Sequence, residues 1–430
     1  MPAPRPLGSD LSTFRPLPEP EKKSEKSLPI EEPTGALRLR QALSLALLHN
    51  PELASFSWEV RAQEAATLQA GLFPNPEAGA TLEDIGLRQS QTTLQLGQLI
   101  ELGGKRSKMV EVASLTRDLA GWDYEAKRID LFTQVSQAFI DVLSAQQNLA
   151  LIEETVRLSK QVAGVVSERV RAGKVSPIEE TRANVALSAA QIELDRVQRQ
   201  LGATRKRLAA TWGSIRPQFE RVEGDLFSVS PIPALENLAQ RLSQNPELAR
   251  WATEISQRQA VIAFEKSQAV PDLFISGGVR RFTDTNDNAF VVGVTIPLPI
   301  FNRNQGRIME AEHRLKRAAE ERRAAEVRVT TALAEAYRDL STSHAEVRSL
   351  EANVLPGAES AFGAVNEGYR LGKFGLLDVL DAQRTLFGAR AQYLSALRGY
   401  HQAVAEVERL IGEPLNAVQN IPEQNNRSDK

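Results

Sequence analysis

The sequence predicts a mainly α-helical fold with a small β part, built twice in one chain. Three observations support this fold class. Short motifs recur in the same order at an offset of roughly 195–200 residues, which indicates an internal duplication. A stretch of about 100 residues between Pro76 and Pro177 lacks proline and carries a helical pattern. Segments of alternating hydrophobicity occupy equivalent places in both halves and predict two pairs of strands.

Two motifs show the duplication most clearly. NPELA at residues 50–54 recurs at 245–249, and RAGK at 171–174 returns as RLGK at 370–373. We therefore predict two repeats between a proline-rich, disordered N-terminal segment and a disordered C-terminal tail. The predicted bounds are 1–35 for the segment, 36–225 for the first repeat, 226–415 for the second repeat and 416–430 for the tail.

Each repeat is expected to contain a helix, a strand pair, a very long helix, a tight turn and a final helix. Prolines at Pro74 and Pro76 end the first helical pattern, which begins near Leu37. In the first repeat we expect strands at about 77–100, a long helix at 103–172 and a helix at 176–213. In the second repeat the corresponding ranges are about 272–299, 303–371 and 376–411.

The strand signal is clearest in the second repeat. Residues 290–296, FVVGVTI, alternate between large apolar side chains and smaller or more polar ones, which is the period of a strand. Hydrophobicity assigns Val292 and Val294 to a lipid-facing side and Thr295 to the other side. Four strands of about ten residues can cross a bilayer at a tilt, but an open sheet edge is not tolerated in lipid. Several chains would therefore share one sheet, and the residues leave open whether two or three chains do so.

The predicted long helices carry apolar side chains at coiled-coil spacing. A helix from about residue 104 to residue 171 would be roughly 100 Å long. Steps of four and three residues indicate packing against neighbouring helices, and two such seams indicate neighbours on two sides, as in a closed ring of helices. The first seam contains Leu115, Leu119, Trp122, Ala126 and Ile129, and the second contains Val135, Phe139, Val142, Leu149, Ile152 and Val156.

Sharp turns follow the long helices. Gly173 and Gly372 stand where a helix C-terminus favours a left-handed residue. The next helix of the first repeat begins Ser176-Pro177, with Glu179 at the third helical position, which predicts a capping box. In the second repeat Asp378 takes the corresponding place.

Composition and charge exclude several classes of protein. Apolar residues make up 42% of the chain and charged residues 25%, with a formal net charge of -2, so no nucleic-acid partner is expected. Without cysteine there is no disulfide, thiolate metal site or lipid-bearing cysteine. No run of 18 apolar residues predicts a transmembrane helix.

The N-terminal sequence shows no export signal. Residues 1–33 hold eight of the 22 prolines and no apolar h-region. Either this is a disordered cytoplasmic tail, or the chain lacks its signal peptide through processing or a misplaced start. We favour the second interpretation because of the membrane-strand pattern.

No catalytic, cofactor or metal site is predicted. The segment Gly103-Gly104-Lys105 lacks the glycine spacing and the following Ser or Thr of a phosphate loop. No nucleophile, base and orienting group are recognisable together. The histidines form no pair at ligand spacing, and the positions concerned are His49, His313, His344 and His401.

Over residues 36–415 the layout resembles the TolC family of outer-membrane efflux factors. QLIELGGKR at 98–106 and PLPIFNRNQG at 297–306 are similar to the segments that enter the long helices in its cobalt-zinc-cadmium, CzcC-like branch. GYRLGKFGLLDVLDAQ at 368–383 is similar to the family's periplasmic tip. The resemblance implies a homotrimer whose helices form an α-barrel across the periplasm and whose strands form a shared 12-stranded transmembrane β-barrel in outer-membrane lipid. It also implies two partners, a periplasmic membrane-fusion adaptor and an inner-membrane proton-driven exporter.

The resemblance also implies roles for residues at the tip. The acidic pore constriction would comprise Asp378, Asp381 and Glu179, and the gate tyrosine would be Tyr369. Phe374 stands at the position of the gate arginine known in some members, which puts the latch chemistry in doubt. The tip that contacts the adaptor would contain Gly173, Lys174, Gly372 and Lys373.

Each tip residue also has a simpler interpretation. Asp378 and Glu179 lie in first helical turns, where the helix dipole favours an acid, whereas Asp381 lies too deep to cap. Lys174 and Lys373 could be solvated cations at helix C-termini.

The function expected is that of an outer-membrane channel subunit of a tripartite resistance-nodulation-division pump that exports heavy-metal cations such as cobalt, zinc or cadmium. Selectivity for metal would have to lie in its partners. Two alternatives stay open at this point, an exit duct for drug efflux or type I secretion and a soluble coiled-coil scaffold.

Overall fold

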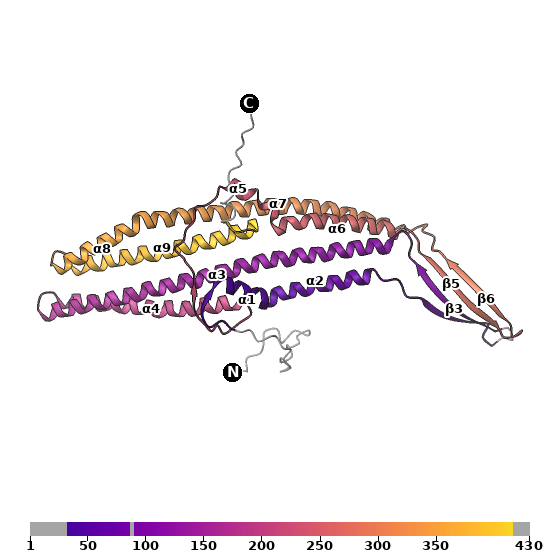
Figure 1. Cartoon of the computed structure of the whole chain (residues 1–430), viewed down its shortest axis with the longest axis horizontal. Coiled ribbons are helices and arrows are strands. Elements are labelled where there is room, and N and C mark those ends of the chain that lie inside the picture. The colour runs from indigo at the N-terminus through magenta and orange to yellow at the C-terminus, as the bar shows by residue number, and fades with distance from the viewer. Residues whose placement is uncertain (1–31, 87–89, 416–430) are drawn as a thin grey trace, which may run out of the picture.

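The chain forms a long rod of helices with a small sheet at one end. In the computed structural model, residues 32–86 and 90–415 are described, so the predicted disordered tail and most of the predicted N-terminal segment lie outside the described residues. The two tight helix turns lie at the end of the rod opposite the sheet (Figure 1). Among the described helices, none is both long enough and apolar enough to span a bilayer. The mainly helical fold class is confirmed.

The described part of the first half contains three short strands and one short helix beside its longer helices. A short strand, β1, precedes helix α1, and the strand pair β2 and β3 leads into α3, the longest helix. The bounds are β1 Gly35–Arg38, α1 Leu39–His49, α2 Pro51–Ala70, β2 Glu77–Glu83, β3 Gln91–Ile100, α3 Lys105–Arg171 and α4 Pro177–Ala210.

The second half repeats this order after a connecting segment. The bounds are β4 Phe219–Glu223, α5 Leu235–Ala239, a 3-10 turn at Leu242–Gln244, α6 Pro246–Gln268, β5 Leu273–Phe282, β6 Asn288–Thr295, α7 Gln305–Ser349, a π-helical turn at Leu350–Val354, α8 Leu355–Arg370 and α9 Leu376–Ile411.

The second long helix is interrupted where continuous helix was expected. The backbone widens into the π-helical turn, in which Leu355 N donates to Leu350 O. Pro356 follows directly, and proline has no N–H for the helical ladder and crowds the preceding turn. A π turn is one of the ways in which a helix accommodates such a local disruption. The helical course expected over 303–371 is therefore made by α7, the π turn and α8.

Two sheets are present among the described residues. The parallel pair of β1 and β4 was not predicted from the sequence. The second sheet has four antiparallel strands in the order β2-β3-β5-β6, so that its central pair, β3 and β5, joins the two halves. Strands β2 and β6 are its edges.

The four-stranded sheet has one apolar face and one polar face. Pairing aligns Leu94 with Val279 and Val279 with Phe290, and it aligns Leu96 with Gly277 and Gly277 with Val292. Because side chains alternate along a strand, the apolar face contains Leu94, Leu96, Ile275, Val279, Phe290, Val292 and Val294. On the opposite face, Arg280 donates to Thr93 Oγ1 at 3.0 Å. Val292 and Thr295 thus occupy opposite faces, as predicted.

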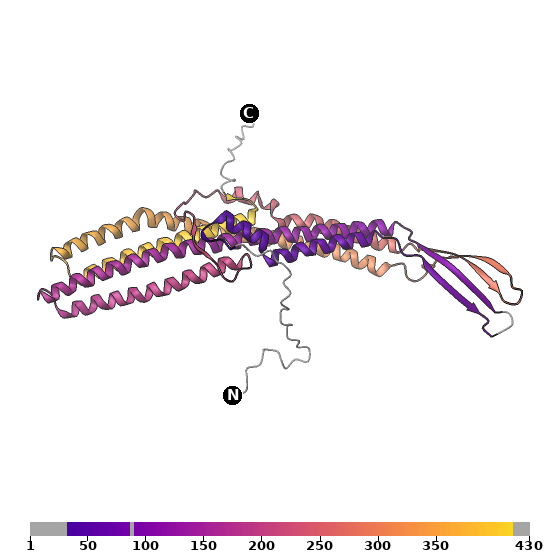
Figure 2. The same cartoon turned by 60° about the horizontal axis from the view of Figure 1, so that its bottom comes forward.

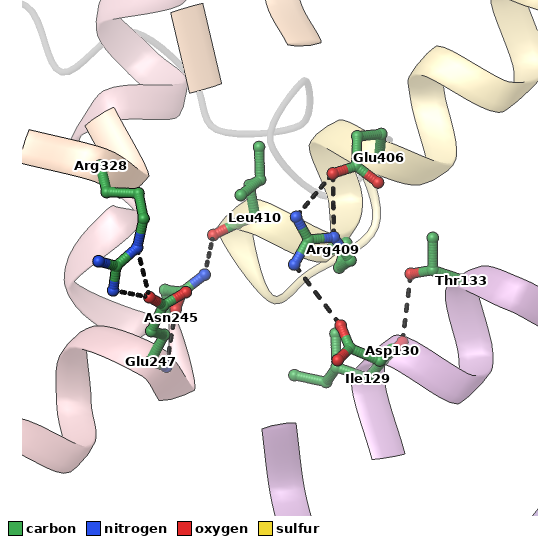
Figure 3. Close-up of polar contacts among 9 residues, drawn as sticks. All are labelled: Ile129, Asp130, Thr133, Asn245, Glu247, Arg328, Glu406, Arg409 and Leu410. Atoms are coloured by element: carbon green, nitrogen blue, oxygen red, sulfur yellow. Dashed lines mark hydrogen bonds and ion pairs between the residues drawn. The ribbon is translucent and has the colours of Figure 1, made fainter. Parts of the chain in front are cut away.

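The asparagine of the repeated NPELA motif makes the same two kinds of hydrogen bond in both halves. Asn50 Oδ1 accepts from Leu53 N at 2.7 Å, and its Nδ2 donates to Thr211 O at the end of α4 at 2.8 Å. Asn245 Oδ1 accepts from Glu247 N at 2.8 Å, and its Nδ2 donates to Leu410 O near the end of α9 at 2.8 Å (Figure 3). Each asparagine therefore caps one helix and joins it to the last helix of its own half.

The main core lies in the middle of the rod, where helices of both halves pack together (Figure 2). Trp212, Leu208, Leu397 and Ile411 are fully buried there. Beside the core, an arginine of α9 reaches α3: Arg409 pairs with Glu406 at 2.6 Å and with Asp130 at 3.5 Å (Figure 3).

Candidate functional site

The two turns at the tip of the rod have the same backbone geometry. Gly173 has φ +66° and Gly372 has φ +75°, a left-handed conformation that strains residues with a β-carbon. Lys174 N donates to Arg169 O at 2.9 Å, and Lys373 N donates to Gly368 O at 2.7 Å. This closure of a helix end is the Schellman motif.

Both lysines predicted to contact an adaptor are exposed. Lys174 and Lys373 follow the turn glycines, and neither forms an ion pair with another described residue. Their position at the extreme end of the rod makes the two ammonium groups available to an acidic surface, while the glycines set the shape of the turns.

The predicted capping box of the first repeat is not formed. Ser176 Oγ accepts from Ile178 N at 3.4 Å rather than from Glu179 N. Glu179 N donates to the backbone oxygen of Ser176 at 2.9 Å. Within the described part of the chain, Glu179 Oε2 is buried without a hydrogen-bond partner. Serine thus caps the helix alone, and the carboxylate is directed elsewhere.

The two aspartates of α9 have different surroundings. Asp378 Oδ2 accepts from Gly375 N at 2.8 Å, so this carboxylate stabilises the start of the helix. Asp381, one turn further, has a side chain that is 67% exposed and pairs with Arg384 at 2.8 Å. Within the described part of the chain, no hydrogen bond joins either aspartate to Glu179. One chain therefore presents separate acids.

Tyr369 lies in the last turn of α8, just before the second tight turn, and is 5% exposed. The Arg169 guanidinium from α3 lies 4.6 Å from the centre of the tyrosine ring, and Arg169 Nη1 donates to Tyr369 O at 3.3 Å. The tyrosine hydroxyl is buried and has no hydrogen-bond partner among the described residues. The ring face and the backbone oxygen, rather than the hydroxyl, connect the end of α8 to the end of α3.

Phe374 packs against the backbone of α8. A β-carbon at Gly368 would lie 2.3 Å from Phe374 Cδ2, so only glycine leaves room for the ring. Phe374 stands where the family resemblance implies a gate arginine, whereas no sequence pattern pointed to Arg169. Arg169 carried no sequence signal for a cation–π contact, because its ring partner, Tyr369, comes from the other half of the chain.

A groove lies behind the turns, between α3, α4 and α9. Its volume is about 640 Å³, and its polar part contains Thr155, Ser159, Asp381, Gln383 and Arg384. Its apolar part contains Ile152, Ala186, Leu377, Leu380 and Phe387. Gln383 is buried and donates to Ser159 Oγ at 3.2 Å. Among the described residues, no group of three or more His, Asp or Glu side chains is arranged to hold a metal ion.

The family of this chain follows from comparison with known protein families. The family described as outer membrane efflux protein matches residues 42–214 and 237–413. The chain belongs to this family. The resemblance to TolC-type proteins is therefore confirmed, as are the outer-membrane location with extension into the periplasm and the class of channel rather than enzyme. The alternative of a soluble scaffold is wrong.

Relatives of this outer membrane efflux protein include metal-resistance proteins. The cobalt-zinc-cadmium resistance protein CzcC of Cupriavidus metallidurans is 40% identical over 89% of this chain and 91% of its own length. The nickel-cobalt-cadmium resistance protein NccC of Alcaligenes xylosoxydans xylosoxydans is 26% identical over 67% of this chain and 66% of its own length.

Solved structures share the fold. A structure of CusC has a TM-score of 0.74 at 18% identity, covering 87% of this chain and 92% of that chain. The outer membrane protein VceC from Vibrio cholerae has a TM-score of 0.72 at 18% identity, covering 88% of this chain and 96% of that chain.

Proposed function

We propose that this channel is the exit duct of a tripartite pump that exports heavy-metal cations, with cobalt, zinc and cadmium as the first candidates. The observation that carries this proposal is the 40% identity to CzcC, whose name specifies resistance to these three metals. The chain itself offers no metal cluster among its described residues, so we assign the choice of metal to its partners and passage of the metal to the duct.

The sheet supports a shared assembly. It has one apolar face and two unpaired edges, β2 and β6, and open edges are not tolerated in lipid. We propose that three chains join edge to edge and close a 12-stranded barrel in the outer membrane, with the helices extending into the periplasm. The exposed tip, with Lys174 and Lys373, would then face a periplasmic adaptor, beyond which lies a proton-driven exporter of the inner membrane.

Growth under metal stress tests the substrate. We expect deletion of the gene in its host to increase sensitivity to cobalt, zinc or cadmium, and we expect the restored gene to reverse this. Sensitivity to a hydrophobic drug should not change. The pyoverdine export protein OpmQ of Pseudomonas aeruginosa is also related, at 23% identity. If the deletion changes only the export of drugs or siderophores, that class of compound, and not metal, is the substrate.

Charged substitutions on the sheet test its place in the membrane. Val292 is 78% exposed on the apolar face, and an arginine there would cost roughly 2–4 kcal/mol near the middle of a bilayer. We expect Val292→Arg to reduce assembled trimer in outer-membrane fractions, whereas Thr295→Arg on the opposite face should be much better tolerated. Equal tolerance of both changes would show that the sheet does not lie in the membrane.

A further inference from the structure

A cavity lies where the sheet meets the helices, at the foot of the apolar face. Its volume is about 720 Å³, and its walls come from the end of α2, the end of β3 and the start of α3. Gln98, Leu99 and Ile100 contribute to it. Because side chains alternate, Gln98 and Ile100 share a strand face with Leu94 and Leu96, and Leu99 lies on the other face. The cavity therefore adjoins the apolar face of the sheet at the end nearest the helices.

The cavity contains a guanidinium group without an acidic partner. Arg106 lines it and forms no ion pair with any described residue, in contrast to its neighbour Lys105, which is buried and pairs with Asp272 at 2.6 Å. The Arg106 guanidinium lies 3.5 Å from the centre of the Phe73 ring. Such stacking holds the cation in place but leaves its N–H groups free to bind an anion.

The walls around Arg106 are apolar and open. Phe73 is 72% exposed and Ile100 is 39% exposed. Gln98 Nε2 donates to Pro74 O at 2.9 Å, which holds the segment after α2 against β3. One acid, Glu101, also lines the cavity, and it lies beyond ion-pair distance of Arg106.

We propose that this cavity binds the headgroup of an anionic phospholipid from the inner leaflet of the outer membrane. The phosphate binds Arg106, and the acyl chains lie along the apolar face of the sheet. The proposal rests on the proposed position of the sheet in the membrane. A cation beside an apolar surface at the level of the headgroups is suited to a lipid of this charge, whereas a soluble anion would make no use of the apolar walls.

Native mass spectrometry of the purified trimer tests this site. We expect the wild-type protein to retain phosphatidylglycerol in preference to phosphatidylcholine with the same acyl chains. Arg106→Gln should weaken retention of phosphatidylglycerol about fivefold, the effect of one basic residue near an anionic surface. Glu101→Gln should strengthen retention, because it removes a negative charge of the cavity lining that repels the lipid phosphate. Arg307→Gln is the matched control, since Arg307 lies exposed in the first turn of α7, outside the cavity.

Three results would overturn the inference. The first is equal retention of both lipids by the wild-type trimer. The second is unchanged retention in Arg106→Gln, or unchanged retention in Glu101→Gln should Arg106→Gln fail to assemble. The third is displacement of phosphatidylglycerol by inorganic phosphate alone, which would show a simple anion site. A wild-type chain that neither trimerises nor enters membranes would instead contradict the proposed function.

Discussion

At the scale of the residue, two neighbouring acids of the tip have different contacts, one with the backbone and one with a side chain. Asp378 binds the backbone at the start of α9, and Asp381 is exposed beside Arg384. We propose that in the trimer each aspartate forms a three-fold set near the axis of the duct. A ring of carboxylates attracts cations, and the different contacts of the two acids allow the charge to be tested separately from the fold.

Removing charge from α9 should change ion selectivity. We expect Asp381→Asn, alone and together with Asp378→Asn, to lower cation selectivity in planar bilayers and to weaken block by multivalent cations. Asparagine keeps an acceptor for Gly375 N, so stability should fall by about 1 kcal/mol or less. Asp381→Glu, which keeps the charge, is the control. If the folded double variant has unchanged selectivity, the constriction lies elsewhere.

The contact between Arg169 and Tyr369 predicts an unusual pattern of variants. Because the ring face binds the guanidinium and the hydroxyl has no partner among the described residues, Tyr369→Phe should leave the resting conductance of the tip near that of the wild type. Arg169→Gln should raise it, through loss of a cation–π interaction of about 0.5–2 kcal/mol. Single-channel recording measures both. A Tyr369→Phe channel as leaky as Arg169→Gln would assign the latch to the hydroxyl.

At the scale of the element, local sequence rules predicted the bounds and faces of helices and strands, but they did not predict contacts between distant segments. The first long helix was expected at 103–172 and spans Lys105–Arg171, because glycine and proline mark both of its ends. The alternation of β6 predicted which residues share a face. The pairing of β1 with β4 was missed because each strand is short and its partner is distant in sequence. Arg169 was missed for the same physical reason, since its partner lies in the other half.

Two adjacent glycines of β5 should respond differently to the same substitution. A β-carbon at Gly278 would lie 2.2 Å from Leu94 O and 2.8 Å from Gln95 Cα, whereas at Gly277 nothing lies within 4 Å. We expect Gly278→Ala to force β3 and β5 apart and to reduce folded trimer, and Gly277→Ala to be tolerated. Heat-modifiable migration on gels measures the folded fraction. Similar loss in both variants would contradict this account of the β3–β5 contact.

At the scale of the whole molecule, each half is closed by its own asparagine. Asn50 joins the start of α2 to the end of α4, and Asn245 joins the start of α6 to the end of α9. Both side chains are buried, and each uses its oxygen as a helix cap and its amide as a donor to the other helix. The ends of each half are thereby held at the middle of the rod.

The losses of stability caused by replacing these two asparagines should be additive. We expect Asn50→Ala and Asn245→Ala each to destabilise the protein by about 1–2 kcal/mol, from loss of a helix cap and of a buried hydrogen bond. The double variant should lose the sum, because the two sites share no partner. Denaturant unfolding in detergent measures this. Asn→Asp at either site keeps the cap and loses the donor, so an effect as large as that of alanine would assign the stability to the amide alone.

The order β2-β3-β5-β6 has a consequence for symmetry. Inside the chain, the second strand of one hairpin pairs with the first strand of the next, as β3 pairs with β5. In the proposed trimer, β6 of one chain meets β2 of its neighbour, which is again a second strand beside a first strand. Six hairpins then follow one another around the axis with one kind of neighbour contact. Three chains thus approximate a six-fold ring, in which a covalent linker replaces every second subunit boundary.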